Sequence, residues 1–296
     1  MSDYKHLLPD FWPVLQLSDR ERVLFMDQPR WIGYPAAHSV LDTLGQLLDM
    51  PKRPRMRNLL ITGESNNGKT TIIRHFVEKH GEGYVNENAE PVRPIILAEA
   101  PPSADEKGLY VALLDRLWTP YRTTDSVLTL RYQVLHMFRE LHVKMLVIDE
   151  IHSLLTGSAI KQREVMNAIK MICNDLVIPV VVLGTEDAVR VLHHDPQHSS
   201  RFDVMKLGPW KLNADFQRLL KAFEAVIPLK RPSEIYKAET AQLIHSISGG
   251  NIGNVHRLLI ECARDAIASG QEHIDRELIE SKSWLRPTRG IRELMG

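Results

Sequence analysis

The sequence has little cysteine and no excess of charge of either sign. Only Cys173 and Cys262 occur among 296 residues, far apart and in segments with the spacing of buried helices. A disulfide framework is therefore not expected, and a reducing compartment fits. Lys plus Arg and Asp plus Glu both number 37, so the formal net charge is zero. Any contact with nucleic acid must then depend on a local basic patch.

Long hydrophobic runs are also missing. No stretch approaches eighteen consecutive apolar residues, the length that a membrane span needs. The opening MSDYKHLLPDFWPVL has acidic residues and prolines where a secretion signal has a basic region followed by an apolar one. We therefore expect a soluble, cytoplasmic protein with no membrane partner. No internal repeat or low-complexity tract is present.

From Asn58 onwards the sequence alternates short apolar runs with amphipathic segments. The runs have the length of buried strands, and the segments between them have helical spacing. This order predicts an α/β fold with a five-stranded parallel sheet and helices on both of its faces. Strands are expected at 58–62, 94–98, 144–149, 178–184 and 204–207, and helices at 70–80, 106–118, 126–142 and 161–176.

The two ends of the chain differ from this core. Residues 1–57 hold several prolines and two candidate helices, and they end in the basic connector PKRPRMR. After Trp210 the strand pattern stops, and helical spacing over 214–226, 234–248, 252–269 and 275–283 predicts a small all-helical domain. The expected organisation is an N-terminal extension at 1–57, a core at 58–210, a helical lid domain at 211–283 and a C-terminal tail at 284–296.

The stretch GESNNGKT (63–70) matches a P-loop. It follows a predicted strand and precedes a predicted helix, the setting in which backbone N–H groups and a helix N-terminus hold nucleotide phosphates. Lys69 is expected to reach the β and γ phosphates and the Thr70 hydroxyl to hold Mg²⁺. A chance match in a glycine-containing turn is the alternative. The predicted nucleotide-binding residues of this stretch are Gly63, Glu64, Ser65, Asn66, Asn67, Gly68, Lys69, Thr70 and Thr71.

Two adjacent carboxylates end the predicted strand MLVIDE (145–150), about eighty residues after the P-loop. Asp149 is expected to support Mg²⁺ and Glu150 to polarise the attacking water, a pairing that indicates nucleotide hydrolysis. A strand that simply runs into an acidic turn is the alternative. Thr185 follows the next predicted strand, where its side chain could contact the γ-phosphate or its water, or instead cap the following helix.

Together these motifs resemble those of AAA+ ATPases, and more closely those of the TniB family of transposition ATPases, relatives of TnsC and MuB. The resemblance covers nearly the whole chain. The P-loop is generic, whereas DEIHSLL followed by an N-x-x-K helix, NDLVIP and GT is much more specific. The matching stretches are RWIGYP (30–35), GESNNGKT (63–70), VIDEIHSLLTG (147–157), KQREVMNAIKMICNDLVIPVVVLGT (161–185) and RFDVMKLGPW (201–210).

The resemblance implies a regulator of transposition rather than a transposase. Proteins similar to this one bind ATP with Mg²⁺ and assemble on double-stranded DNA as homo-oligomeric rings or helical filaments. They recruit and activate a DDE transposase of the TniA or TnsB type and work with a target adaptor of the TniQ type. ATP hydrolysis then disassembles the platform. The implied location is the bacterial cytoplasm, and the nucleoid when the protein is on DNA.

The resemblance also assigns roles to single residues. Thr185 matches the sensor-1 position. Arg201 stands where AAA+ proteins place an arginine that reaches the nucleotide of a neighbouring subunit, although a solvated arginine or an internal ion pair stays open. Segment 248–263 resembles the one that carries a sensor-2 arginine, but Gly253 occupies that position and Arg257 follows one turn later. This departure puts the coupling between lid and nucleotide in doubt.

Two more segments are interpreted through the resemblance. Trp31, Ile32 and Tyr34 are expected either near the adenine base or as anchors of the extension. The region 99–125 is expected to face DNA through phosphate contacts, which are largely independent of sequence and sensitive to salt. Solvated charges on a helix face are the alternative. The candidate DNA-binding residues are Lys107, Arg116, Arg122 and Thr123.

Other functions fit part of the sequence. A helicase loader shares the core but acts on a helicase, and a small-molecule kinase is disfavoured by the Asp149–Glu150 pair. A binding module could hold ATP only as a structural ligand. The tail is either a partner-binding peptide or a frayed end, and the loop histidines lack metal-ligand spacing. These last residues are Trp284, Arg286, Arg289 and Arg292 in the tail and His193, His194 and His198 in the loop.

Overall fold

The structure of the protein is a computed structural model that describes residues 4–193 and 201–283. The chain forms two compact units. Within the described residues, unit 1 holds 4–34, 66–68 and 208–283, and unit 2 holds the remaining residues. The domain boundaries expected at residues 57, 210 and 283 stay predictions. The tail and the loop residues His194 and His198 lie outside the described residues.

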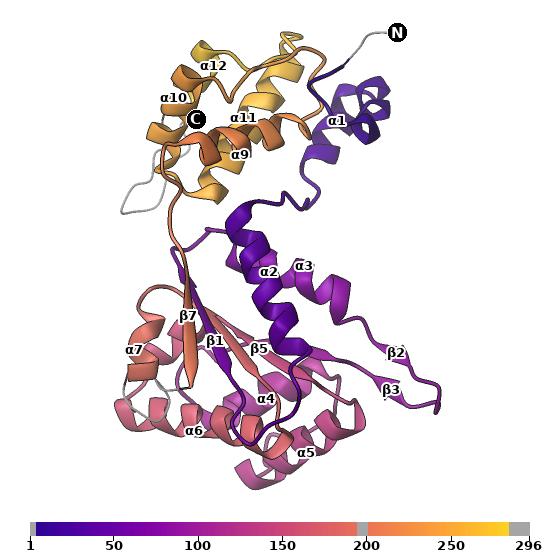
Figure 1. Cartoon of the computed structure of the whole chain (residues 1–296), viewed down its shortest axis with the longest axis vertical. Coiled ribbons are helices and arrows are strands. Elements are labelled where there is room, and N and C mark those ends of the chain that lie inside the picture. Colours follow the sequence, from indigo (N-terminus) through magenta and orange to yellow (C-terminus); the bar gives the residue numbers. More distant parts are fainter. Residues whose placement is uncertain (1–3, 194–200, 284–296) are drawn as a thin grey trace. The chain divides into compact units, whose positions relative to one another are not determined.

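Unit 2 is built on a parallel sheet with the order β4-β5-β6-β1-β7 (Figure 1). The fold prediction is therefore confirmed, since all five expected strands are present. Apolar side chains bury the inner strands on both faces, whereas β7, at one edge, exposes several of its residues. The strands are β1 (Asn58–Gly63), β4 (Ile95–Glu99), β5 (Met145–Asp149), β6 (Val180–Gly184) and β7 (Phe202–Leu207).

Helices cover both faces of this sheet (Figure 1). Successive strand residues point to opposite faces. Leu60, Leu146 and Val182 share a core with α4, α5 and α6, while α3, with α2 against it, packs on the other face. The helices of unit 2 are α2 (Pro35–Leu48), α3 (Lys69–His80), α4 (Glu106–Arg116), α5 (Val127–Glu140), the 3₁₀ helix η3 (Ile151–Thr156), α6 (Ala159–Leu176) and α7 (Ala188–His193).

A short antiparallel hairpin, β2 (Tyr84–Val85) with β3 (Pro91–Val92), extends unit 2 and was not expected from the sequence. Each of its strands is two residues long, too short to show an alternating pattern. Its turn is held by Asn86, whose side-chain oxygen accepts from the backbone of Asn88 and Glu90.

Unit 1 is helical, as predicted for the last third of the chain. Its long helices bury apolar faces that include Phe216, Ile244 and Leu258. The N-terminal segment belongs to the same unit, because Arg22 of α1 is fully buried and donates to both carboxylate oxygens of Glu272. The elements are η1 (Pro9–Phe11), η2 (Pro13–Gln16), α1 (Asp19–Met26), α9 (Ala214–Glu224), α10 (Ala238–Ser248), α11 (Ile252–Ala268) and α12 (Arg276–Ser281).

Both cysteines are buried and unoxidised, Cys173 in α6 and Cys262 in α11. Among the described helices, none combines the length and the apolar character that crossing a membrane requires.

Candidate nucleotide-binding site

The P-loop lies at the carboxyl edge of the sheet, between the end of β1 at Gly63 and the start of α3 at Lys69. Gly63 pairs with Leu207 of β7, and a Cβ on Gly63 would stand 2.4 Å from the Leu207 carbonyl oxygen. Only glycine therefore fits there. Asn66 and Gly68 have φ angles of 62° and 82°, so the loop turns through the left-handed region twice.

Lys69 is a buried cation without a counter-ion. Its side chain is 7% exposed, and Nζ donates to the carbonyl oxygens of Gly63 (2.9 Å) and Glu64 (2.8 Å). Of the described carboxylates, none forms an ion pair with it. Burial lowers the pKa of Lys69, and the more distant charges of Glu150 and Asp149 only partly oppose this. The ammonium is thus ready to stabilise an incoming anion.

Thr70 and Asp149 form a pair of oxygen ligands beside Lys69. The Thr70 hydroxyl donates to Asp149 Oδ2 at 2.7 Å, and the Glu150 N–H donates to Asp149 Oδ1 at 2.8 Å. Asp149 is buried at the end of β5. A hydroxyl and one carboxylate match the sparse protein ligation that Mg²⁺ accepts when phosphate and water supply the rest. The residues present therefore fit a Mg–nucleotide.

Glu150 leaves the strand in the left-handed conformation, with φ 56° and ψ 35°. This turn sends its side chain outwards, where it is 51% exposed. His152 Nδ1 lies 3.2 Å from Glu150 Oε2, although the two atoms do not meet in hydrogen-bonding geometry. A carboxylate that is exposed to solvent beside a buried Mg²⁺ ligand can accept a proton from water.

Thr185 directly follows β6, the strand between β1 and β5. Its carbonyl oxygen accepts from the Ala188 N–H at the start of α7. Its half-buried hydroxyl makes no hydrogen bond to the described residues, so it does not cap α7 through its side chain. Its place at the carboxyl edge is compatible with the predicted γ-phosphate contact, which stays a prediction.

Arg201 lies at the opposite edge of the sheet. It precedes β7, which runs parallel to β1, so the whole strand separates it from the P-loop. Six residues of strand span about 20 Å. The guanidinium donates to Asn174 Oδ1 at 2.8 Å. Arg201 is therefore too far away to touch a nucleotide in its own P-loop, and its predicted role in a neighbouring subunit is untested.

The N-terminus of α11 contacts the middle of the P-loop within unit 1. The Gly253 N–H donates to Asn66 O at 3.1 Å, and the Ile252 N–H reaches Asn67 Oδ1 at 3.4 Å. A Cβ on Gly253 would come within 2.2 Å of the Asn66 side chain. The backbone thus occupies the expected sensor-2 position. Arg257 is exposed one turn further on and makes no hydrogen bond or ion pair to any described residue.

Tyr34 also reaches the loop within unit 1. It is buried against Trp210, with ring centroids 5.1 Å apart, and its hydroxyl would lie 3.6 Å from a Cβ on Gly68. Burial raises the pKa of Tyr34 to about 12, so the phenol is neutral. Trp31 and Ile32 are half-buried just before it. Composition and spacing gave no signal for this contact, and only the resemblance pointed to the segment.

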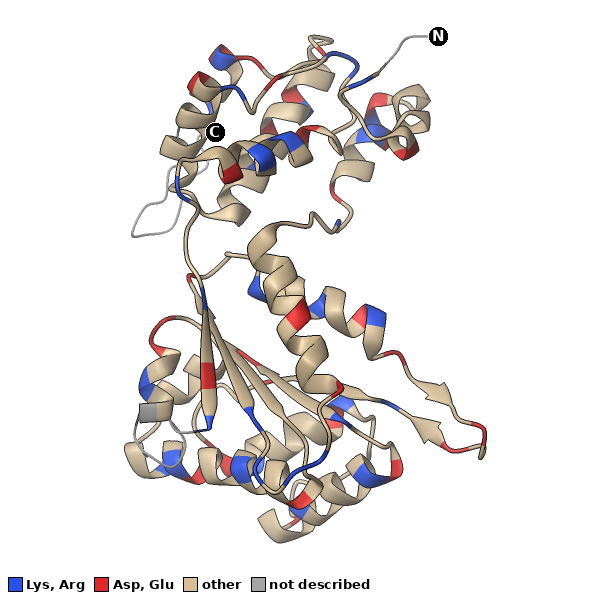
Figure 2. Ribbon diagram, in the orientation of Figure 1, with Lys and Arg blue, Asp and Glu red and all other residues tan. Residues whose placement is uncertain are grey.

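The four DNA-binding candidates do not form one cluster. Lys107, in the first turn of α4, donates to the Thr123 carbonyl oxygen at 2.7 Å, whereas Arg116 lies in the last turn. The two ends are about 13 Å apart along the helix. Arg122 is exposed. Figure 2 shows basic and acidic residues interspersed along the described part of the ribbon.

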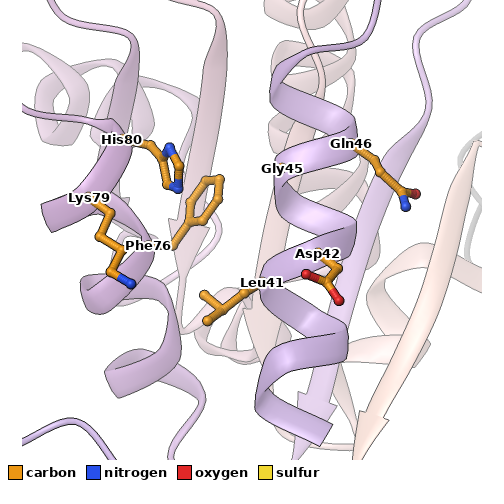
Figure 3. A pocket seen from close by; sticks show the side chains of 7 residues that line it. All are labelled: Leu41, Asp42, Gly45, Gln46, Phe76, Lys79 and His80. Atoms are coloured by element: carbon orange, nitrogen blue, oxygen red, sulfur yellow. The ribbon is translucent and has the colours of Figure 1, made fainter. Parts of the chain in front are cut away.

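A cavity of about 520 Å³ lies between α2 and α3 (Figure 3). The residues that α3 gives to its lining lie in the last turns of that helix, seven or more residues beyond Lys69, and the others come from α2. That places it at least about 10 Å along the helix from the P-loop. It holds none of the predicted site residues and is not the phosphate site. The lining residues are Leu41, Asp42, Gly45, Gln46, Phe76, Lys79 and His80.

Comparisons with known proteins agree with this geometry. The model of one protein family, described as TniB, bacterial TniB protein, matches residues 22–212. No curated protein matches the chain.

Several solved structures have a similar fold. They include Aeropyrum pernix ORC2 in ADPNP-ADP complexes (14% identity, 90% of this chain and 72% of that chain, TM-score 0.64). Pyrobaculum aerophilum CDC6P has 19% identity (93% and 72%, TM-score 0.65). Aeropyrum pernix ORC1 in complex with DNA has 18% identity (88% and 68%, TM-score 0.62). At these identities the likeness shows the fold alone.

Proposed function

The chain belongs to the TniB family, and from this premise we propose that it is an ATP-dependent, DNA-binding regulator of transposition. It assembles as a homo-oligomer on double-stranded DNA and recruits and activates a DDE transposase of the TniA or TnsB type, together with a TniQ-type adaptor. ATP hydrolysis releases the assembly from DNA. The site of action is the cytoplasm, on the nucleoid.

The observation that carries the ATPase part is the buried, unpaired ammonium of Lys69 next to the Thr70–Asp149 pair. A charge enclosed without a counter-ion costs folding free energy unless a ligand supplies one. The donor set matches a nucleotide phosphate on one side and Mg²⁺ on the other, where the metal would supply positive charge to the phosphate oxygens.

The chain's own residues then have distinct tasks. Lys69 and the backbone N–H groups of the loop bind the phosphates, and Thr70 and Asp149 hold Mg²⁺. Glu150 orients the attacking water and accepts its proton. The Thr185 hydroxyl contacts the γ-phosphate or that water. Because Arg201 cannot reach its own nucleotide, we assign it to the site of a neighbouring subunit, so that hydrolysis depends on assembly.

Three residues of unit 1 keep their predicted roles in nucleotide binding. Trp31 and Ile32, just before the Tyr34 that reaches Gly68, border the base. Arg257 lies one turn after Gly253 on α11, and helical side chains lean towards the N-terminus of their helix. Its side chain is therefore directed towards the loop end of α11, in place of the missing sensor-2 arginine.

Double-stranded DNA is the proposed partner, contacted through phosphates by Lys107, Arg116, Arg122 and Thr123. The family and the complex of ORC1 with DNA support this assignment. The zero net charge means that one subunit offers few contacts. An oligomer multiplies them, since linked weak sites bind far more tightly than single ones.

The test is sedimentation or light scattering with DNA at several salt concentrations, with ATP, ADP or no nucleotide. We expect large complexes only with both ATP and double-stranded DNA, persistent in Glu150→Gln and absent in Lys69→Ala. Turnover of ATP without DNA-dependent assembly in any condition would overturn the proposal in favour of a helicase loader or a metabolic P-loop enzyme. Co-purification of a helicase in place of a transposase would do the same.

A further inference from the structure

Helices α4, α5 and α6 of unit 2 end in the same backbone motif. In each, a left-handed residue ends the helix: Trp118 (φ 55°) and His142 (φ 49°) directly follow the C-caps of α4 and α5, and Val177 (φ 53°) is the C-cap of α6. The residue that follows donates its N–H back to a carbonyl oxygen five positions earlier, as in Thr119 to Leu114. This is the Schellman motif, whose left-handed position strongly favours glycine.

Two of these three left-handed residues have a structural use for their side chains. Val177 packs against the hydrophobic core, and His142 Nε2 lies 3.2 Å from Glu90 Oε2 in the turn of the hairpin. Trp118 has none. It is 91% exposed, and its indole makes no hydrogen bond or ring contact to the described residues.

Trp118 therefore combines two unfavourable features that glycine would avoid. A side chain with a Cβ is strained in the left-handed region, and a large aromatic ring is placed in water. Exposed apolar residues are common singly, but this one gains nothing from the fold and loses by its conformation. A residue that costs stability and offers an unused aromatic face is suited to a partner outside the chain.

The end of α4 that carries Trp118 also holds two fixed arginines. Arg116 Nε donates to the Leu97 carbonyl oxygen at 2.7 Å, and Arg93 Nη1 donates to the Arg116 carbonyl oxygen at 2.8 Å. Both guanidinium groups are held by neutral carbonyls, and neither forms an ion pair with a carboxylate of the described residues. Burial, and then the charge of Arg116, lowers the pKa of Arg93, which shows that the two cations repel.

The carboxylates nearby have other partners. Burial, and then the charge of Asp115, raises the pKa of Tyr121, so Asp115 lies near the Tyr121 hydroxyl, and Glu90 faces His142. The other end of α4 differs, because Lys107 already donates to Thr123 and stands beside Asp105 and Glu106. The Trp118 end therefore offers an aromatic face with spare positive charge, and the Lys107 end does not.

We propose that Trp118, Arg93 and Arg116 form a DNA-binding point, in which the guanidinium groups bind phosphates and the indole stacks on or wedges between bases. This inference rests on the proposed DNA-binding function and names the residues that carry it. Arginine next to an exposed aromatic ring is the combination that proteins use on nucleic acid, whereas a protein partner would not require two uncompensated cations.

Trp118→Gly separates this role from a structural one. Glycine is favoured in the left-handed position, so the melting temperature should stay the same or rise. DNA affinity with ATP should fall about tenfold, the loss typical of removing one stacking aromatic. His142→Gly changes the same motif at the end of α5 and should leave DNA affinity unchanged. Arg93→Gln and Arg116→Gln should weaken binding and reduce its salt dependence.

A second readout follows the indole directly. Acrylamide quenching of tryptophan fluorescence, taken as the difference between wild type and Trp118→Phe, should show Trp118 accessible in the free protein and shielded on DNA. If wild type binds DNA and Trp118→Gly binds equally well with no shielding, the inference is wrong while the proposed function survives. If wild type binds no DNA with ATP, both are wrong. Retained DNA binding with lost capture of the transposase would assign Trp118 to a protein contact and overturn the inference.

Discussion

The protein encloses two cations in opposite ways, one in each unit. Arg22 in unit 1 is fully buried, donates to both oxygens of Glu272 and also to the Pro228 carbonyl oxygen at 2.7 Å. Lys69 in unit 2 is nearly as buried but faces only the carbonyl oxygens of Gly63 and Glu64. Arg22 has its counter-ion within unit 1, whereas Lys69 has none among the residues that the structure describes.

The pKa values of the two groups move in opposite directions. Burial alone would lower the pKa of both cations, and for Lys69 it does. For Arg22, the hydrogen bonds and charge of Glu272 outweigh burial and raise its pKa. Arg22 is therefore a structural charge that joins α1 to the helical unit, whereas Lys69 is a binding charge whose counter-ion must come from a ligand. Burial alone does not distinguish the two roles, but the presence of a counter-ion does.

The largest expected effect comes from breaking the pair in unit 1. Arg22→Ala should lower the free energy of unfolding by about 3–5 kcal/mol, because it removes the buried cation that holds both oxygens of Glu272 and leaves the exposed Lys230 as the ion-pair partner. Lys69→Met should cost less than about 1 kcal/mol, or stabilise, since it removes a cation that lacks a counter-ion. Urea unfolding monitored by circular dichroism measures both.

The control for Arg22→Ala is the double variant Arg22→Met with Glu272→Leu, which removes both charges and should recover much of the loss. A Lys69→Met protein as unstable as Arg22→Ala would contradict the distinction between the two cations.

The buried ion pair of unit 1 should make the stability of the protein depend on pH in the acid range. Hydrogen bonds from Arg22 and Lys230 outweigh burial and lower the pKa of Glu272 from 4.5 to about 2. The contribution of Glu272 to the free energy of unfolding is therefore complete above pH 4.5. About 3 kcal/mol of it is lost as the pH falls towards 2. Glu272→Gln should flatten the stability curve in this window, as acid titration of the unfolding midpoint would show. An unchanged slope in that variant would remove Glu272 as the cause.

Lys69 should affect stability at alkaline pH, and there the charged form is the destabilising one. Its pKa is lowered in the folded state, so the unfolded chain holds the proton more tightly and stability should rise as the pH passes through the folded pKa towards 10.5. Lys69→Met should abolish that rise, and urea midpoints measured across the alkaline range would detect it.

A ligand should also stabilise the protein, by less than the ion pair of Arg22 does. ATP with Mg²⁺ at about 100 times its Kd should stabilise the protein by about 2.7 kcal/mol, measured as a rise in melting temperature of Glu150→Gln, where turnover is blocked. The rise should vanish when Lys69→Met is added. Arg22→Met with Glu272→Leu should keep it, since that pair does not meet nucleotide. If the rise in melting temperature were lost in both of these variants, it would report general stability rather than nucleotide binding.

The sequence predicts the sheet and the P-loop well because both depend on local patterns. The apolar runs before Gly63 and Asp149 are continuous, and GESNNGKT has a fixed spacing. The starts of helices are predicted less accurately. Helix α6 begins at Ala159, two residues before the expected start, because the Ser158 hydroxyl caps the helix by accepting from the Lys161 N–H.

The remaining features depend on contacts between distant residues, which no local pattern records. Arg22 stands in DRER, a run that indicates a solvated helix face, yet its partner Glu272 is 250 residues away. The contact of Tyr34 with Gly68 likewise joins residues that are far apart in the sequence. Trp118 matched the pattern of a helical residue, and the sequence predicted that its helix would continue to that position. The structure ends α4 at Arg116 and turns Trp118 out of it.

The contact between Gly253 and Asn66 limits how this protein can be redesigned. Installing the missing arginine by Gly253→Arg alone would push the new Cβ into the Asn66 side chain and disturb the loop before any guanidinium reached phosphate. Asn66 has a positive φ that glycine accepts readily. Positions 66 and 253 must therefore be changed together, and an arginine engineered at position 253 requires Asn66→Gly as well.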